Sequence, residues 1–317
     1  MRATVWTLLK LAITLGLLGL VIWKTGLYEP QGQRKFLELL TNVDMVFLLL
    51  SFVAGALLNI ISSWKWCWLL RERGVNEPFW RLLALYYVGR FYNMFLPTSV
   101  GGDVARVYGL GIFTGKHMEA AASVIVDRLS GFLTLLALAC VILLMGISKI
   151  DNTLVTLGIV VSVAGALFVW WALVSQTAQR VLDRLFGRFR WLSGLLEKLG
   201  RLRDTLAGYN TRTIVLVALG LSMLFYAMAI ANVYVSARAF IEAPGIYDIA
   251  LSVPIIMVIM NLPVSIGGIG LMESAYTFVF DVVGLGVGVG LSTALLMRVK
   301  TIIDALIGGV LHLLLKK

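Results

Sequence analysis

Ten charged side chains lie inside otherwise apolar stretches of this chain, and they are the residues best placed to do chemistry. The cations are Arg90, Arg106, Arg128, Arg298 and Lys300, and the anions are Asp103, Asp127, Glu273, Asp281 and Asp304. A charge inside a membrane helix costs about 3 kcal/mol on insertion scales, so such residues are functional candidates by default. Equal numbers of opposite charges also allow ion pairs that only join helices. For each arginine, both substrate contact and structural pairing stay open.

Among the arginines, Arg128 is the strongest candidate for contact with a phosphate. It follows Asp127 in a stretch, about 119–146, that is otherwise apolar. A planar guanidinium donates to two phosphate oxygens at once, which a single ammonium does not.

Two carboxylates stand beside glycine-rich breaks and have alternative roles. Glu273 comes three residues after G-G-I-G, so it either carries a coupling proton or caps the amides of the helix that starts there. Asp103 directly follows Gly-Gly and is expected to be the N-cap of the next helix.

Four charged residues, two of them among these ten, have structural explanations in the sequence. Lys300 and Asp304 have i, i+4 spacing, which predicts a pair on one helix face. Lys65 and Arg238 lie near the ends of apolar runs, where long basic side chains are expected to reach toward the head groups.

A short sequence motif occurs twice, about half the chain apart. Residues 93–103 read N-M-F-L-P-T-S-V-G-G-D, and residues 261–270 read N-L-P-V-S-I-G-G-I-G. In both copies leucine, proline, serine and paired glycines align, and this chemistry ends a helix. Broken helices at corresponding places in two halves are typical of a transporter's binding site.

The two breaks predict the substrate site. Irregular backbone at membrane depth must line a cavity or be buried in protein, and a helix that begins near Asp103 or Leu271 offers amide donors to a phosphate or carboxylate. The predicted substrate-binding residues are Arg90, Asn93, Ser99, Gly101, Gly102, Arg106, Arg128, Asn261, Ser265, Gly267, Gly268 and Arg298. The predicted coupling or structural charges are Asp103, Asp127, Glu273 and Asp304.

Composition places these residues in a membrane. The chain is 60% hydrophobic and 14% charged, with a mean hydropathy of +0.92. Apolar runs longer than 18 residues recur along it. We therefore expect one all-α polytopic transmembrane domain over 1–317, with about six full spans and two re-entrant broken-helix units. The expected spans are 4–23, 45–70, 119–146, 153–175, 213–239 and 287–312.

The distribution of lysine and arginine predicts the orientation. It places the N-terminus, residues 71–81, residues 176–212 and the C-terminus on the cytoplasmic side of the cytoplasmic membrane. The two halves, about 45–146 and 213–312, then have opposite orientation, as in an inverted repeat.

Two connecting segments have helical apolar spacing among charges. Residues 24–44 predict a short interfacial helix. Residues 176–212 are basic and predict an amphipathic helix on the anionic inner leaflet, although a solvated connecting helix remains open.

The usual signatures of other function classes are missing from the sequence. It has two histidines and two cysteines without metal-ligand spacing, and it has neither a phosphate-binding P-loop nor a Ser-His-Asp set. We expect no catalytic residue, no metal, no cofactor and no nucleic-acid partner.

The motifs resemble those of a known family. L-P-x-S-x-G-G-D-x-x-R at 96–106, Asp127-Arg128, and P-x-S-I-G-G-I-G-x-x-E at 263–273 are similar to the flippase-like transmembrane domain of lysylphosphatidylglycerol synthases. The resemblance implies lipid translocation and a possible homodimer. The sequence contains no counterpart of the family's aminoacyl-transferase domain, so we expect no synthesis of aminoacylated lipid.

Three functions follow from these observations. The first is a translocase for a phosphate-containing, aminoacylated or glycosylated lipid, driven downhill or by protons. The second is a membrane-embedded enzyme acting on a lipid phosphate or polyprenyl carrier, with Asp103 or Glu273 as base or metal ligand. The third is a secondary transporter of small anions.

Overall fold

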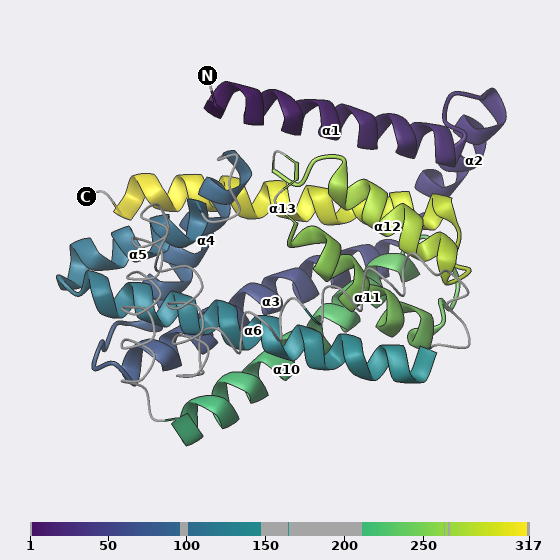
Figure 1. Cartoon of the computed structure of the whole chain (residues 1–317). Helices are drawn as coiled ribbons and strands as arrows, with labels where there is room; N and C mark the ends of the chain where they lie inside the picture. The colour runs from purple at the N-terminus through teal and green to yellow at the C-terminus, as the bar shows by residue number, and fades with distance from the viewer. Residues whose placement is uncertain are drawn as a thin grey trace, which may run out of the picture.

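The computed structural model describes residues 2–95, 101–146, 164, 211–262, 264–265 and 267–315, and its regular elements are α-helices (Figure 1). The helices are α1 (Arg2–Thr25), α2 (Pro30–Thr41), α3 (Met45–Arg71), α4 (Phe79–Phe95), α5 (Gly101–Thr114), α6 (His117–Gly146), α10 (Thr211–Arg238), α11 (Ile246–Met260), α12 (Leu271–Val282) and α13 (Val287–Leu315). The predicted all-α class is confirmed.

Three of these helices are long and apolar enough to cross a membrane: Met45–Arg71, His117–Val141 and Val217–Arg238. The segment Leu9–Thr25 forms a fourth candidate together with α2, although the two helices bend by 91° at their junction. Helix α13 has 29 residues, but it carries three charges near its middle. The predicted span at 153–175 and nearly all of the basic segment 176–212 lie outside the described residues.

Local sequence explains where several helices begin and end. Asp44 caps α3, because its carboxylate accepts hydrogen bonds from the backbone nitrogens of Val46 and Phe47 at 2.9 and 3.3 Å. Helix α2 has proline at its first position. Helix α11 ends at Met260, just before the second repeated segment at 261–270, as the helix-breaking chemistry of proline and glycine predicts.

The two halves contain the same order of helices. Each has a long helix, two short helices and a second long helix: α3 to α6 in the first half, α10 to α13 in the second. Two buried apolar clusters each draw mostly on one half, although Ala139 of the first half belongs to the cluster of the second. Trp66, Leu82 and Leu110 are buried in the first, and Ile249 and Phe280 in the second.

The halves meet where α13 packs along α4 and where α10 packs along α3. Gly308 of α13 lies directly against the backbone oxygen of Tyr87 in α4, and small residues allow this close helix approach in membranes. Helix α1 lies over α12 and α13 (Figure 1), and Lys24 forms an ion pair with Asp281 of α12 at 2.8 Å.

Candidate functional site

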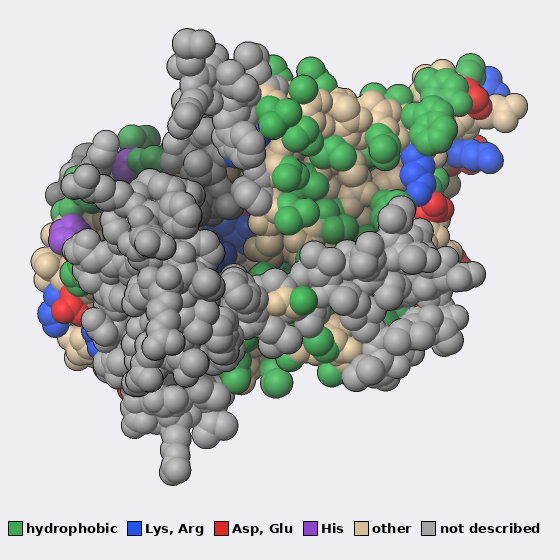
Figure 2. Space-filling view, in the orientation of Figure 1, with side chains coloured by type: hydrophobic (Ala, Val, Ile, Leu, Met, Phe, Trp, Pro, Cys, Tyr) green, Lys and Arg blue, Asp and Glu red, His purple; other side chains and the backbone are tan. Residues whose placement is uncertain are grey.

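A cavity of about 490 Å³ lies where the two halves meet, bounded by the C-terminal end of α4 and by the segment between α11 and α12. Figure 2 shows basic side chains inside a hollow near the middle of the molecule. The described lining residues are Ile61, Ser62, Lys65, Tyr86, Arg90, Asn93, Met94, Asp127, Arg128, Gly131, Phe132, Ser222, Phe225, Tyr226, Met257, Met260, Asn261, Leu262, Ser265, Gly267, Gly268, Leu271 and Thr301.

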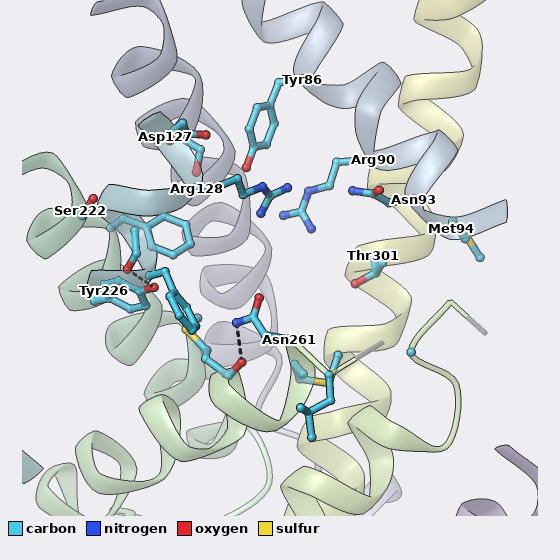
Figure 3. A pocket seen from close by; sticks show the side chains of 18 of the residues that line it. Tyr86, Arg90, Asn93, Met94, Asp127, Arg128, Ser222, Tyr226, Asn261 and Thr301 are labelled. Atoms are coloured by element: carbon cyan, nitrogen blue, oxygen red, sulfur yellow. Dashed lines mark hydrogen bonds between the residues drawn. The ribbon is translucent and has the colours of Figure 1, made fainter. Parts of the chain in front are cut away.

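Two guanidinium groups point toward one another in this cavity (Figure 3). Arg90 comes from α4 and Arg128 from α6. Over half of the Arg128 side chain, 57%, is exposed, and so is 36% of the Arg90 side chain. Two like charges that face each other in a partly enclosed space attract an anion between them.

Arg90 is held by a relay of hydrogen bonds that runs through Asn59 of α3 to Asp304 of α13. Its Nε and Nη2 donate to the Asn59 side-chain oxygen at 3.2 and 2.7 Å. The Asn59 amide in turn donates to Asp304 at 3.0 Å, and Arg90 itself lies 3.6 Å from the Asp304 carboxylate. Asn59 is fully buried, so this relay fixes the direction of Arg90.

Arg128 is held by Asp103, which is in the first turn of α5. Its Nε and Nη2 donate to the two Asp103 oxygens, each at 2.8 Å. Asp103 also accepts from Arg106 at 2.6 Å. The Arg106 guanidinium is stacked between the rings of Trp66 and Tyr86, at 5.1 and 5.0 Å from their centroids.

The second break is closed by Arg298 of α13. Its guanidinium donates to the backbone oxygens of Gly267 and Gly268 at 3.0 and 2.7 Å, and to both Glu273 oxygens at 2.9 and 3.0 Å. Glu273 also accepts from the Gly270 nitrogen at 2.8 Å. Of the two roles considered for Glu273, the structure places it as the cap of α12.

Residues 7–309 match the family described as the lysylphosphatidylglycerol synthase TM region. The chain belongs to this family. It is 26% identical to a UPF0104 membrane protein of Methanothermobacter thermautotrophicus, over 92% of this chain and 89% of that one. A second UPF0104 membrane protein of that organism is 22% identical, over 84% of each chain. No solved structure matches. Family membership and the apolar helices make it a multi-pass membrane protein.

In this member of the lysylphosphatidylglycerol synthase TM family, the predicted site residues divide into four groups, of which Gly101 and Gly102 form the last. Those that line the cavity are Arg90, Asn93, Arg128, Asn261, Ser265, Gly267, Gly268 and Asp127. Those that support it from behind are Arg106, Asp103, Arg298, Glu273 and Asp304. Ser99 lies outside the described residues.

Gly101 and Gly102 are buried beside α4 and do not appear in the cavity lining. Gly102 packs against the Gly89 oxygen and the Asn93 side chain, and its nitrogen donates to the Asn93 oxygen at 2.7 Å. Asn93 therefore caps the start of α5. The expectation that Asp103 is this cap is wrong, because helix α5 already begins at Gly101 and the Asp103 carboxylate faces two arginines.

Two expectations for lysine are also wrong. Lys300 does not pair with Asp304: its Nζ donates to Asn232, Ser236 and the Ser51 backbone oxygen at 2.8, 2.9 and 3.3 Å. Helix α13 points this lysine at α10 and α3 instead of along its own axis.

Lys65 does not reach a membrane surface either. Only 6% of its side chain is exposed, and its Nζ lies 3.1 Å from the Asp127 carboxylate. The Arg238 guanidinium lies over the Phe47 ring at 5.0 Å. That this side chain reaches toward the head groups stays a prediction.

Sequence reasoning missed several lining residues. Tyr86, Ser222, Tyr226 and Thr301 line the cavity from three different helices, α4, α10 and α13. Tyr226 donates to the Gly131 backbone oxygen at 2.9 Å, which fixes its ring at the cavity wall. Each is a tyrosine, serine or threonine in an apolar helix and belongs to no sequence motif, so the local sequence does not indicate a role in the site. Asn59, one polar residue in the apolar run of α3, was the available signal for the relay behind Arg90.

Proposed function

We propose that this membrane protein is a lipid translocase, which moves a lipid with an anionic, phosphate-containing head group across the cytoplasmic membrane. The observation that carries the proposal is the pair formed by Arg90 and Arg128, whose guanidiniums point toward one another in a cavity between two broken helices (Figure 3). Membership in the lysylphosphatidylglycerol synthase TM family supports a lipid substrate.

A phosphate fits the donors that these arginines keep available. Arg90 uses Nε and Nη2 on Asn59, and Arg128 uses Nε and Nη2 on Asp103. Each guanidinium therefore has further N–H donors for a ligand, since arginine carries five. A phosphate between the two groups would remove the repulsion of the facing charges and receive charge-assisted hydrogen bonds from both.

The two halves supply a path for alternating access. We propose that they form an inverted repeat of spans and re-entrant units, supported by the repeated order of helices and by two apolar clusters that each draw mostly on one half. The head group would cross through the cavity while the lipid tails stay in the bilayer. Transport would run downhill or use protons, since the sequence shows no nucleotide-binding motif.

Three further features belong to this proposal. Both termini would be cytoplasmic, residues 176–212 would contact the anionic inner leaflet, and two copies of the chain would pair. The basic composition of 176–212 supports the second feature.

The test is a lipid-crossing assay with the purified protein in liposomes. Phosphatidylglycerol with a fluorescent acyl chain and an unmodified head group is followed by loss of signal to an impermeant reductant, with and without a pH gradient. We expect protein-dependent crossing that falls at least about tenfold in Arg90→Ala and in Arg128→Ala, a loss of about 1.4 kcal/mol or more.

Arg81→Ala is the matched control, because Arg81 is 42% exposed and pairs with Glu77 away from the cavity. It should cross lipid at the rate of the unmodified protein. If lipid failed to cross under every condition, the proposal would be contradicted. Uptake of soluble phosphate without lipid crossing would favour an anion transporter, and a chemically altered lipid would favour an enzyme.

A further inference from the structure

The cavity has a charged side and a neutral side, and they come from different halves of the chain. All four charged residues among the described lining come from the first half: Lys65, Arg90, Asp127 and Arg128. The lining from residue 222 onward is uncharged and includes several polar groups: Ser222, Tyr226, Asn261, Ser265, Gly267, Gly268 and Thr301. A ligand that fills both sides therefore has an anionic part and an uncharged polar part.

Ser265 is the strongest sign of a ligand on the neutral side. It lines the cavity, only 8% of it is exposed, and its hydroxyl has no hydrogen-bond partner within the described part of the chain. A buried hydroxyl without a partner is unfavourable, because it has lost its hydrogen bonds to water. A ligand hydroxyl at this position would remove that cost.

Neighbouring groups extend the neutral side around Ser265. The Asn261 amide donates to the Met257 backbone oxygen at 2.8 Å, which leaves its side-chain oxygen to accept. Gly267 and Gly268 have positive φ angles of 58° and 69°, which glycine adopts without strain, and both line the cavity. This set donates and accepts hydrogen bonds but carries no charge.

The carboxylate on the charged side is already paired. Asp127 is the one acidic residue among the described lining residues, and it lies 3.1 Å from the Lys65 Nζ and 3.8 Å from the Arg106 Nη2. An ammonium group on the ligand would meet an excess of cations and no carboxylate free to pair with it. Burying an unpaired ammonium is strongly unfavourable.

We infer that the cavity selects a phosphodiester whose substituent is an uncharged, hydroxyl-rich group such as a glycerol or a sugar, and that it disfavours a substituent with an ammonium group. The phosphate lies between Arg90 and Arg128, and hydroxyls of the substituent contact Ser265 and Asn261. A cavity of about 490 Å³ is within the range of small-molecule sites. This inference rests on the proposed function and names its substrate class.

The experiment compares three lipids with identical labelled acyl chains in the same liposomes: phosphatidylglycerol, phosphatidylethanolamine and lysyl-phosphatidylglycerol. We expect phosphatidylglycerol to cross at least about tenfold faster than either ammonium-bearing lipid, which corresponds to about 1.4 kcal/mol of discrimination. A glycosyl phosphodiester lipid as a fourth arm should cross at a rate comparable to phosphatidylglycerol. Glycerol phosphate as a soluble fifth arm should not be taken up.

Ser265→Ala tests the neutral side, and Ser292→Ala is its matched control. Ser292 is also a buried serine whose hydroxyl lacks a described partner, but it does not line the cavity. We expect Ser265→Ala to slow phosphatidylglycerol severalfold with little effect on phosphatidylethanolamine, and Ser292→Ala to leave the ratio of the two rates unchanged. Size-exclusion profiles of both variants check that they fold.

The outcomes separate this inference from the proposed function. Faster crossing of lysyl-phosphatidylglycerol or phosphatidylethanolamine than of phosphatidylglycerol would overturn the inference and leave translocation standing. An unchanged rate ratio in Ser265→Ala would overturn the role of Ser265. Uptake of glycerol phosphate would overturn the lipid as the source of the head group, and crossing of no lipid would overturn the proposed function itself.

Discussion

Asp103 and Arg128 form a two-point ion pair between α5 and α6, with both Asp103 oxygens accepting from the guanidinium at 2.8 Å. Glu273 and Arg298 form the same kind of pair between α12 and α13, at 2.9 and 3.0 Å. In each pair the acid lies in the first turn of the short helix after a break, and the arginine follows 25 residues later.

The two pairs differ in what the arginine faces. The Arg128 side chain is 57% exposed and lines the cavity, whereas the Arg298 side chain is 16% exposed and binds the backbone of its own break. The acid–arginine pair therefore presents a cation to the cavity in the first half, whereas in the second half it holds the backbone of the break.

The first prediction exchanges the members of the Asp103–Arg128 pair. Asp103→Arg combined with Arg128→Asp restores an ion pair but puts a carboxylate where the cavity now has a guanidinium. We expect each single change to lower the midpoint of thermal unfolding in detergent by about 2–4 °C, the equivalent of roughly 1 kcal/mol.

The double variant should recover only part of that loss of stability, because Arg106, which donates to Asp103 at 2.6 Å, would then face an arginine. It should recover none of the lipid crossing, because a carboxylate repels phosphate. Thermal unfolding and the crossing assay measure the two properties separately. Recovery of crossing in the double variant would mean that Arg128 acts only through its pair with Asp103.

The second prediction concerns Glu273. Its two oxygens accept from Arg298 and from the Gly270 nitrogen, so removing the whole carboxyl group leaves buried donors without acceptors. Glu273→Gln keeps one acceptor oxygen of the same reach. We expect Glu273→Ala to unfold at a lower temperature than Glu273→Gln, and both at a lower temperature than the unmodified protein. Equal midpoints for the two variants would argue against the capping role.

The third prediction tests the stacked position of Arg106. Lysine keeps the charge but not the flat guanidinium that lies between Trp66 and Tyr86. Because the Arg106 side chain is only 3% exposed, we expect Arg106→Lys to destabilise the protein by on the order of 1–3 kcal/mol. Thermal unfolding measures the change.

Arg81→Lys is the control for this prediction, because Arg81 also lies over an aromatic ring, that of Phe113, but is 42% exposed. Exposed substitutions usually change stability by no more than about 0.5 kcal/mol. Similar midpoints for Arg106→Lys and Arg81→Lys would refute the role given to the buried stack.

The fourth prediction concerns the contact of α13 with α4. A Cβ at Gly308 would overlap the Tyr87 backbone oxygen, and backbone atoms do not move aside as flexible side chains do. We expect Gly308→Ala to separate the two helices and to lower the unfolding midpoint.

Gly220→Ala serves as the comparison, since nothing lies within 4 Å of a Cβ at that helical position. Alanine is favoured over glycine inside a helix by about 0.5–1 kcal/mol, so this change should be neutral or stabilising. A neutral Gly308→Ala would show that α13 and α4 pack less closely than described.

Several helices and the second break were readable from the sequence because their causes are local. The apolar run predicted at 45–70 is α3 (Met45–Arg71), and the run at 287–312 is α13 (Val287–Leu315). The predicted start of a helix near Leu271 is also confirmed. Apolar length, proline and glycine act within a few residues, so the chain itself displays them.

Only the tertiary structure decided which charges meet. Lys300 is four residues from Asp304, yet it contacts Asn232 and Ser236, 68 and 64 residues away. The sequence showed that Arg128 is costly in an apolar helix, but the packing of α5 on α6 selected Asp103 as its partner and opened the rest of it to the cavity. Partner choice depends on which helix faces face each other, and this follows from the packing of whole helices, not from spacing along one of them.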